Sequence, residues 1–267
     1  MLDQAGLQVR GLAKSYGGLQ AVHGLDFSVQ AGECVALIGP NGAGKSTTFA
    51  CIAGQQQPSA GQLLWQGRLL NGLAPSQRLA LGLARTFQVA QTFEALTVLQ
   101  NVQLVLPGVS RLLPWKRLDH AQPQPALALL ACVGLQEQAH SVAAALPYGA
   151  KKRLELAMAL AGIQGQSDGP GLLLLDEPAA GLAPTERRSL MQLVRGLTRR
   201  PHNGTGLAVL YTEHNMDAVF GFADRVLVLL QGRLAAAGTP QEVAVNPLVR
   251  SQYLGQGVGH WEQDAHA

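Results

Sequence analysis

The sequence has few cysteines and lacks the histidine and cysteine spacings that bind metals. Its three cysteines, Cys34, Cys51 and Cys132, lie far apart and form no C-x-x-C pair, and its seven histidines show neither an H-x-x-x-H nor an H-E-x-x-H spacing. Zinc sites and thiol redox sites use such spacings. We therefore expect small, reduced cysteines in the core and no zinc site.

Long apolar runs and strong net charge are also missing. No stretch approaches the roughly 20 apolar residues that span a bilayer, and the most apolar runs, Leu172–Leu175 and Val226–Leu230, have the length of strands. The N-terminus has no basic-then-apolar start, which argues against a secretory signal. A net charge of +3 is too small to indicate an obligate nucleic-acid partner. Only 14% of the residues are charged, so we expect a partner to cover apolar surface.

The hydrophobic period changes twice along the chain. Strand-like runs separated by turn residues fill the first ninety or so positions, a helical period holds from about 92 to 163, and β/α alternation resumes after 171. This pattern predicts an α/β fold in which a helical block interrupts a βαβ-type core. The expected strands are Leu7–Leu12, Ala21–Val29, Cys34–Ile38, Gln62–Gln66, Ala84–Gln88, Leu172–Leu175, Leu207–Tyr211 and Arg225–Leu230.

Capping signals and prolines predict where the helices begin and end. Capping boxes begin at Thr97 and Thr239, and the prolines of the helical block predict loop. The expected helices are the one from the Gly-rich run to about Ala53, then Thr97 through Leu106, Ala126–Val133, Ala150–Ala161, about 184–198 and about 215–222. The prolines expected to break the block are Pro107, Pro114, Pro123 and Pro125.

A glycine-rich motif follows the third strand and begins the first helix. It matches G-x-x-x-x-G-K-[ST], whose backbone N–H groups surround phosphate oxygens and whose helix directs its positive end at them. Lys45 is expected to reach the β- and γ-phosphates, and the Ser46 hydroxyl is expected to bind Mg²⁺. The predicted nucleotide-binding residues here are Gly39, Pro40, Asn41, Gly42, Ala43, Gly44, Lys45, Ser46 and Thr47.

Two adjacent carboxylates follow the apolar run Leu172–Leu175. A continuous apolar run is typical of a strand buried on both faces of a parallel sheet, and ligands bind at the carboxyl end of such strands. We expect Asp176 to hold Mg²⁺ through water, and Glu177, on the other side of the pleat, to polarise the attacking water. Phosphoryl transfer is the predicted chemistry, and the absence of an N-K-x-D motif argues against a G-protein.

Five further positions lie in the order of one family's motifs. They are Tyr16, Gln88, Leu146–Ala150, Ala180–Ala183 and His214. With the phosphate loop and the carboxylates, they make the sequence resemble the nucleotide-binding subunits of ATP-binding cassette (ABC) transporters over nearly the whole chain. The resemblance implies a P-loop NTPase (RecA-like) core with an antiparallel β subdomain and an inserted α-helical subdomain.

The resemblance also implies domain boundaries. We expect one nucleotide-binding domain, in which about 1–91 and 164–255 form the core with its β subdomain and about 92–163 form the helical subdomain, followed by a flexible tail at 256–267.

Roles for individual residues follow from the resemblance. Tyr16 would stack on adenine, and Gln88 would contact Mg²⁺ and sense the membrane subunit. His214 would lie near the γ-phosphate, and the catalytic groups would be Glu177, His214 and Lys45. Taken alone, Tyr16 also suits an edge strand, Gln88 a polar strand end, and His214 an ordinary surface position.

The segment 146–150 occupies the place of the family's Leu-Ser-Gly-Gly-Gln signature, which acts on the nucleotide of the opposite subunit. Its expected contacts are Pro147, Tyr148, Gly149 and Ala150. Pro147 replaces the usual serine, Ala150 replaces glutamine, and Ala183 stands where aspartate is common in the loop after Glu177. Each lost contact costs about 1–3 kcal/mol, so we expect a functional but weaker ATP-bound dimer.

Partners are likewise implied by the resemblance: membrane-spanning permease subunits, a second cassette in a head-to-tail dimer, and indirectly a solute-binding protein. The chain would lie peripherally on the cytoplasmic face of the membrane. The segments Ala84–Gln88, Pro147–Leu156 and Thr212–Asp217 are similar to ATPases for branched-chain amino acid uptake. Urea or amide import, a non-transport assembly ATPase and a regulatory subunit with little turnover are the alternatives.

The basic run Lys151–Arg153 follows the signature. It could contact anionic lipid or phosphate, but a solvated helix start is the interpretation that the sequence favours.

Overall fold

Two β-sheets organise the chain in the computed structural model, which describes residues 6–108, 123–164, 169–199 and 206–254. The strands are β1 Gly6–Tyr16, β2 Leu19–Gln30, β3 Cys34–Ile38, β4 Ala60–Trp65, β5 Arg68–Leu69, β6 Leu83–Arg85, β7 Leu172–Asp176, β8 Ala208–Thr212, β9 Arg225–Leu230 and β10 Arg233–Gly238. The helices are α1 Lys45–Ala53, α2 Pro75–Leu79, α3 Val98–Val105, α4 Pro123–Val133, α5 Tyr148–Ile163, α6 Pro184–Arg199, α7 Met216–Phe220, α8 Pro240–Val245 and α9 Pro247–Val249.

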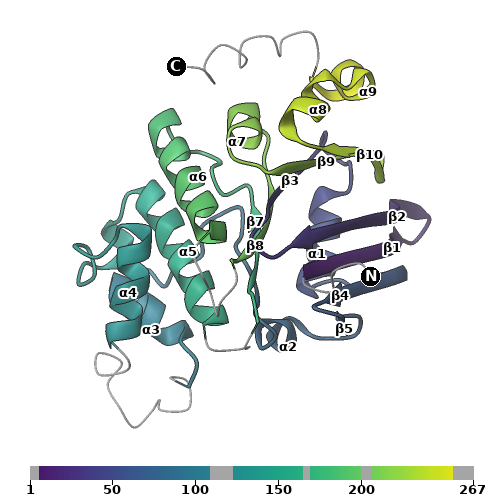
Figure 1. Cartoon of the computed structure of the whole chain (residues 1–267). Helices are drawn as coiled ribbons and strands as arrows, with labels where there is room; N and C mark the ends of the chain where they lie inside the picture. The colour runs from purple at the N-terminus through teal and green to yellow at the C-terminus, as the bar shows by residue number, and fades with distance from the viewer. Residues whose placement is uncertain (1–5, 109–122, 165–168, 200–205, 255–267) are drawn as a thin grey trace.

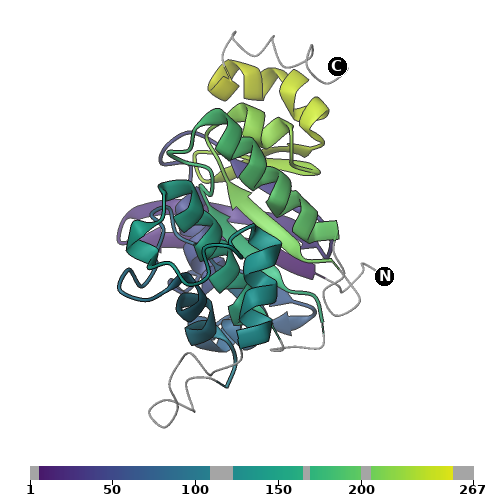
Figure 2. The same cartoon turned by 90° about the vertical axis from the view of Figure 1, so that its left-hand side faces the viewer.

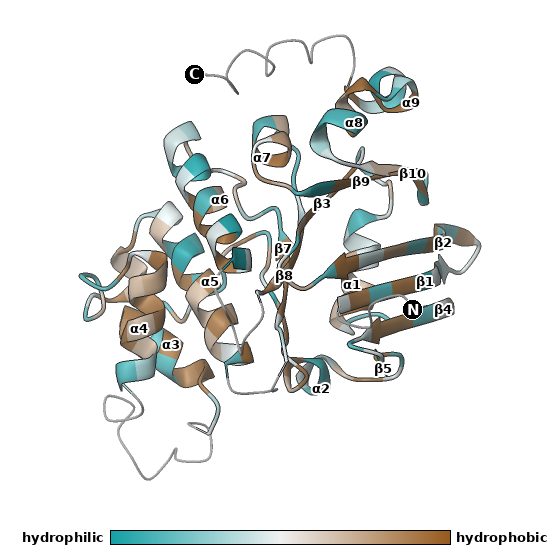
Figure 3. Cartoon of the chain, in the orientation of Figure 1, coloured by the Kyte–Doolittle hydropathy of each residue, from teal (hydrophilic) through white to brown (hydrophobic). Residues whose placement is uncertain are grey.

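A mostly parallel sheet forms the centre of the molecule, in the order β10-β9-β3-β8-β7-β6. Its strands pair in parallel except β10, which is antiparallel to β9. Every residue of β3 and β8 is buried, as expected for strands covered on both faces. Figure 3 shows these strands as almost entirely hydrophobic.

The two faces of the central sheet belong to two different cores. Ala36 and Leu173 pack with the apolar sides of α3, α4, α5 and α6, whereas Leu37 and Leu174 pack with α1 and the antiparallel sheet β2-β1-β4-β5. Helices therefore cover one face and the antiparallel sheet with α1 covers the other (Figure 1). This agrees with the expected core, β subdomain and inserted helical block.

The helical block lies beside the central sheet, away from the antiparallel one. Its helices α3, α4 and α5 pack against each other, and the view in Figure 2 shows them in front of the sheet. A 3₁₀ turn at Ala143–Ala145 precedes α5, and a π-helical turn at Arg250–Leu254 follows α9. The capping boxes expected at Thr97 and Thr239 are both present.

Two local expectations differ from the structure, and a third concerns residues that it does not describe. Strand β6 ends at Arg85, so Phe87 and Gln88 lie in a loop instead of closing a strand. Pro123 and Pro125 do not break the chain, because they lie in the first turn of α4, where a helix needs no backbone N–H donor. Pro114 and the expected tail 256–267 lie outside the described residues.

The helix that follows the phosphate loop is fixed at its far end by a buried arginine. Arg78 of α2 is 1% exposed, and its guanidinium donates to the carbonyls of Cys51 and Ile52, both at 2.6 Å, in the last turn of α1. It also donates to the carbonyls of Leu70 and Leu73. A cation at the C-terminal end of a helix satisfies its unpaired carbonyls and its dipole.

We expect Arg78→Met to lower the free energy of unfolding by about 3 kcal/mol, because it leaves buried carbonyl groups without donors. Urea denaturation measures the change. Arg68→Met is the matched control, since Arg68 is exposed, and should change stability by less than about 0.5 kcal/mol. Equal losses in the two variants would contradict the role of Arg78.

Candidate functional site

The phosphate loop connects β3 to α1 in a conformation that glycine permits. Gly39 has φ of 150°, and a Cβ there would lie 2.1 Å from the Leu229 carbonyl oxygen. Gly44 precedes Lys45 with φ of 99° and would place a Cβ 2.8 Å from the Ala21 carbonyl. The loop can therefore pack against the neighbouring backbone only with glycine at these positions.

Lys45 begins α1 and is 7% exposed. Its Nζ donates to the carbonyl oxygens of Gly39, at 2.6 Å, and Pro40, at 3.1 Å. Burial lowers the pKa of Lys45, and the nearby carboxylates of Glu177 and Asp176 oppose this shift. The ammonium group is thus held by carbonyls of its own loop and interacts with the charge of the two carboxylates. Ser46 and Thr47 follow in the first turn of α1.

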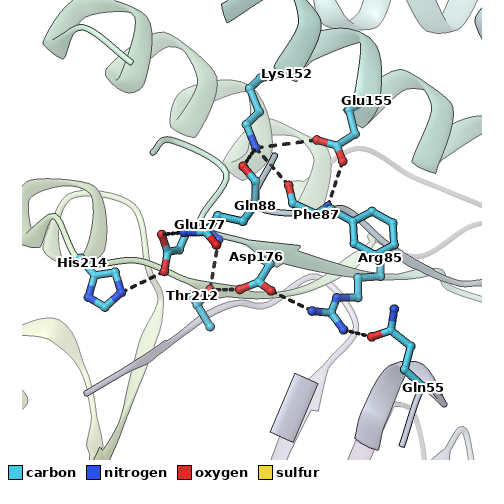
Figure 4. Close-up of polar contacts among 10 residues, drawn as sticks. All are labelled: Gln55, Arg85, Phe87, Gln88, Lys152, Glu155, Asp176, Glu177, Thr212 and His214. Carbon is cyan, nitrogen blue, oxygen red and sulfur yellow. Dashed lines mark hydrogen bonds and ion pairs between the residues drawn. The ribbon is translucent and has the colours of Figure 1, made fainter. Parts of the chain in front are cut away.

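Asp176 ends β7 and is held by groups from both neighbouring strands. Its Oδ1 accepts a hydrogen bond from the Thr212 hydroxyl of β8, and its Oδ2 accepts one from the Arg85 guanidinium of β6, both at 2.8 Å. The Arg85 guanidinium also donates to the Gln55 side chain (Figure 4). No local pattern in the sequence indicates Arg85 or Thr212, because only the register of the parallel strands brings them to Asp176.

The Glu177 carboxylate contacts side chains from two other loops. Its Oε1 lies 2.9 Å from His214 Nε2, and its Oε2 accepts a hydrogen bond of 3.0 Å from the Gln88 amide (Figure 4). Glu177 has φ of 46°, so it has left the strand and does not lie on the opposite side of a pleat as expected. The turn in its backbone directs the carboxylate toward Gln88 and His214.

Tyr16 and the segment 146–150 lie at the ends of secondary-structure elements. Tyr16 ends β1, is 44% exposed, and has the Lys14 ammonium 4.9 Å from its ring centroid. Pro147 is the N-cap residue of α5, which begins at Tyr148, two residues earlier than expected. Gly149 and Ala150 continue the first turn, so their backbone N–H groups are among those without a helical acceptor.

The oxygen donors at the site suit Mg²⁺. Ser46, Gln88 and Asp176 offer hydroxyl, amide and carboxylate oxygens, which hard cations prefer. Within the described part of the chain there is no group of three or more His, Cys, Asp and Glu residues that could hold a metal. These side chains therefore fit Mg²⁺ that arrives with phosphate ligands, as is usual for this ion in nucleotide sites.

One basic run differs from expectation. Lys151 is partly exposed and pairs with the exposed Glu94, but Lys152 is only 3% exposed and donates to the backbone carbonyls of Phe87 and Gln88. The expected solvated start of the helix is therefore wrong for Lys152. The local sequence around Lys152 does not indicate its burial, because the loop that it contacts lies 64 residues away along the chain.

A buried glutamate connects the loops after β7 and β8. Glu213 is 3% exposed; Oε1 accepts the Ala179 N–H at 2.8 Å and Oε2 accepts the His214 N–H at 3.2 Å. Burial raises the pKa of Glu213 above its ordinary value, and the backbone hydrogen bonds oppose this shift. The only signal for Glu213 in the sequence is its position directly before His214.

The model of the family described as ABC transporter matches residues 22–180, more than half of the chain. The chain belongs to the ABC transporter family. It is an ATPase of the cassette type, with the predicted P-loop NTPase fold. Among its relatives is the high-affinity branched-chain amino acid transport ATP-binding protein LivG of Escherichia coli (strain K12), 39% identical over 96% of this chain and all of that protein.

Another ABC relative is the lipopolysaccharide export system ATP-binding protein LptB of Acidithiobacillus ferridurans, 34% identical over 93% of this chain and 96% of that protein. A solved ATP-binding cassette of an ABC transporter in its ADP conformation is similar in structure. It has a TM-score of 0.81 and 26% identity, over 94% of this chain and 99% of that one. Among the described residues, no helix is long and apolar enough to cross a membrane.

The raised pKa of Glu213 predicts a pH dependence of stability. The usual value is 4.5, so the folded state binds the proton more tightly than the unfolded state, and the stability that this contributes is lost as pH rises through the native pKa. The free energy of unfolding of the wild type minus that of Glu213→Gln should therefore fall as pH rises above 4.5 and then level off. Urea denaturation across this range measures it, and a rising difference would contradict it.

Proposed function

We propose that this chain binds and hydrolyses ATP to power an ABC importer for branched-chain amino acids or a related small polar solute. The observation that carries the ATPase mechanism is the convergence of Gln88 and His214 on Glu177 beside the phosphate loop. Relatives such as LivG, a branched-chain amino acid transport ATP-binding protein, support the solute class.

In this mechanism the backbone of the phosphate loop and Lys45 bind the phosphates of ATP. Glu177 acts as the general base on the attacking water, and Gln88 and His214 orient its carboxylate through the hydrogen bonds that they already make. Ser46, Asp176 and Gln88 would hold Mg²⁺, which neutralises charge on the β- and γ-phosphates when bound. Tyr16, exposed at the end of β1, is available to stack on the adenine ring.

A second cassette completes each site in this proposal. The first turn of α5 directs unpaired N–H groups of Tyr148, Gly149 and Ala150 outward, and a helix N-terminus favours phosphate. A copy or close relative of this chain, packed head to tail, would bring those groups to the γ-phosphate of the other subunit. Pro147 has no hydroxyl to add, so the contact rests on the backbone.

The membrane partner would bind a groove between the central sheet and the helical block. The cavity there has a volume of about 460 Å³ and a largely apolar lining. Phe87 and Phe93 are 38% and 50% exposed at the groove, and Val105 and Met158 line it. A short amphipathic helix of a permease fits such a surface. The chain would then lie peripherally on the cytoplasmic face of the membrane, with a solute-binding protein as an indirect partner.

Glu177→Gln tests the catalytic assignment. We expect Mg²⁺-ATP hydrolysis to fall by about 100-fold or more, because the general base is lost, while ATP still binds and accumulates a dimer. Turnover assays and size-exclusion chromatography with ATP measure the two effects. Glu137→Gln, at an exposed position, should retain wild-type turnover. Equal hydrolysis by the wild type and Glu177→Gln would show that Glu177 is not the base.

Pro147→Ser tests the weakened signature. In the Glu177→Gln background, a serine hydroxyl at the N-cap of α5 should tighten the ATP-driven dimer by about tenfold, the value of roughly one added hydrogen bond. Sedimentation equilibrium with ATP measures the dissociation constant. Pro247→Ser, at the first position of α9, is the matched control and should leave dimerisation unchanged. An unchanged dimer with Pro147→Ser would contradict the missing contact.

The partner also discriminates between functions. Purification from membranes with a multi-span protein supports the transporter ATPase, whereas purification with soluble partners alone supports an assembly ATPase. Competition of solutes in uptake assays then separates branched-chain amino acids from urea or amides.

A further inference from the structure

Helix α5 holds the loop that carries Gln88 through two side chains one turn apart. Lys152 Nζ donates to the carbonyl oxygens of Phe87, at 3.0 Å, and Gln88, at 2.6 Å, while Glu155 Oε1 accepts the Phe87 N–H at 2.8 Å. Lys152 and Glu155 are themselves 3.8 Å apart. Figure 4 shows these groups above the loop, with the Gln88 side chain directed to Glu177 on the other side.

This arrangement is buried and charged, which stability alone does not explain. Lys152 is 3% and Glu155 is 6% exposed. Burial lowers the pKa of Lys152 and raises that of Glu155, while their mutual attraction opposes both shifts. Apolar residues of similar volume usually stabilise a core as well as a buried ion pair does. What this pair does specifically is to fix the position of the peptide between Phe87 and Gln88.

The same helix begins at the signature segment. Lys152 and Glu155 are four and seven residues after Tyr148, the first residue of α5. A rotation or shift of α5 would therefore move Lys152 and Glu155, and with them the backbone groups of the Gln88 loop to which they bond. Glu155 and Phe87 also line the groove between the helical block and the sheet, so the contact lies where that groove meets the catalytic side chains.

We propose that Lys152 and Glu155 are positioning residues that hold Gln88 against Glu177 and tie the Gln88 loop to the signature helix. This inference rests on the proposed ATPase mechanism, in which Gln88 orients Glu177. Neither residue touches the reacting atoms; both act through the backbone of Phe87 and Gln88.

Steady-state kinetics of Lys152→Met, with Lys151→Met as the control, test the positioning role. We expect Lys152→Met to lower kcat by about 10- to 100-fold with KM for ATP changed less than about threefold, because a misplaced group impairs the chemical step and leaves the phosphate loop intact. Lys152→Arg, which retains donors for two carbonyls, should restore most of kcat. The control Lys151→Met removes only the ion pair to the exposed Glu94 and should match the wild type.

Amide hydrogen exchange tests the contact without ATP turnover. In Lys152→Met, and in Glu155→Gln as a second variant in case the first does not fold, the segment 86–91 should exchange faster while the peptides of β3, β7 and β8 keep wild-type protection. Faster exchange with unchanged kcat would show that the loop is held but that Gln88 position does not matter. Unchanged exchange in a folded variant would overturn the inference. Absence of turnover in the wild type would instead count against the proposed ATPase mechanism.

Discussion

Parallel pairing of β6, β7 and β8 is the constraint on which the site depends. Asp176 lies opposite Thr212, and Arg85 lies opposite Leu174. The sheet thus joins groups that are 36 and 91 residues apart at one carboxyl edge. A slip of one residue in β8 would move Thr212 to the other face and break its bond to Asp176. The apolar residues of these strands fix the register, so the geometry of the carboxylate is set by the core beneath it.

The charged groups of the site are satisfied by other protein groups. Lys45 donates to carbonyls of its own loop, and Glu177 accepts from Gln88 and His214. Such pairing lowers the cost of partial burial, since an unpaired charge away from water is unfavourable. In the proposed mechanism, phosphates that bind to Lys45 would compete with two carbonyl groups, whereas the hydrogen bonds to Glu177 are already present. Under that proposal, nucleotide binding would rearrange Lys45 and leave the position of Glu177 unchanged.

Local patterns in the sequence were enough to predict an α/β fold with an inserted helical block, the phosphate loop and the adjacent carboxylates. The P-loop NTPase core with its antiparallel β subdomain was implied by the family resemblance. The motifs depend on residues that are close in sequence: Gly39 and Gly44 in the loop, and the apolar run before Asp176. The roles given to these residues stay predictions. Arg85, Thr212, Lys152 and Glu213 could not be selected in this way, because their contacts depend on strand register or on the packing of α5. The loop at Gln88 was misread as strand for the same reason: its backbone partners are the side chains of a helix and not another strand.

Helix α5 shows why the altered signature segment can leave the contacts between the helical block and the Gln88 loop intact. Its first turn carries the signature positions, its second turn grips the Gln88 loop, and its later apolar residues, such as Leu156 and Leu160, belong to the core shared with the central sheet. A side-chain hydroxyl at Pro147 is one contact at the tip of this helix, whereas the Lys152 and Glu155 contacts and the apolar packing lie along its body. In the proposed mechanism, substitution at the tip would alter how the helix meets a nucleotide, while the contacts that connect α5 to the Gln88 loop are kept.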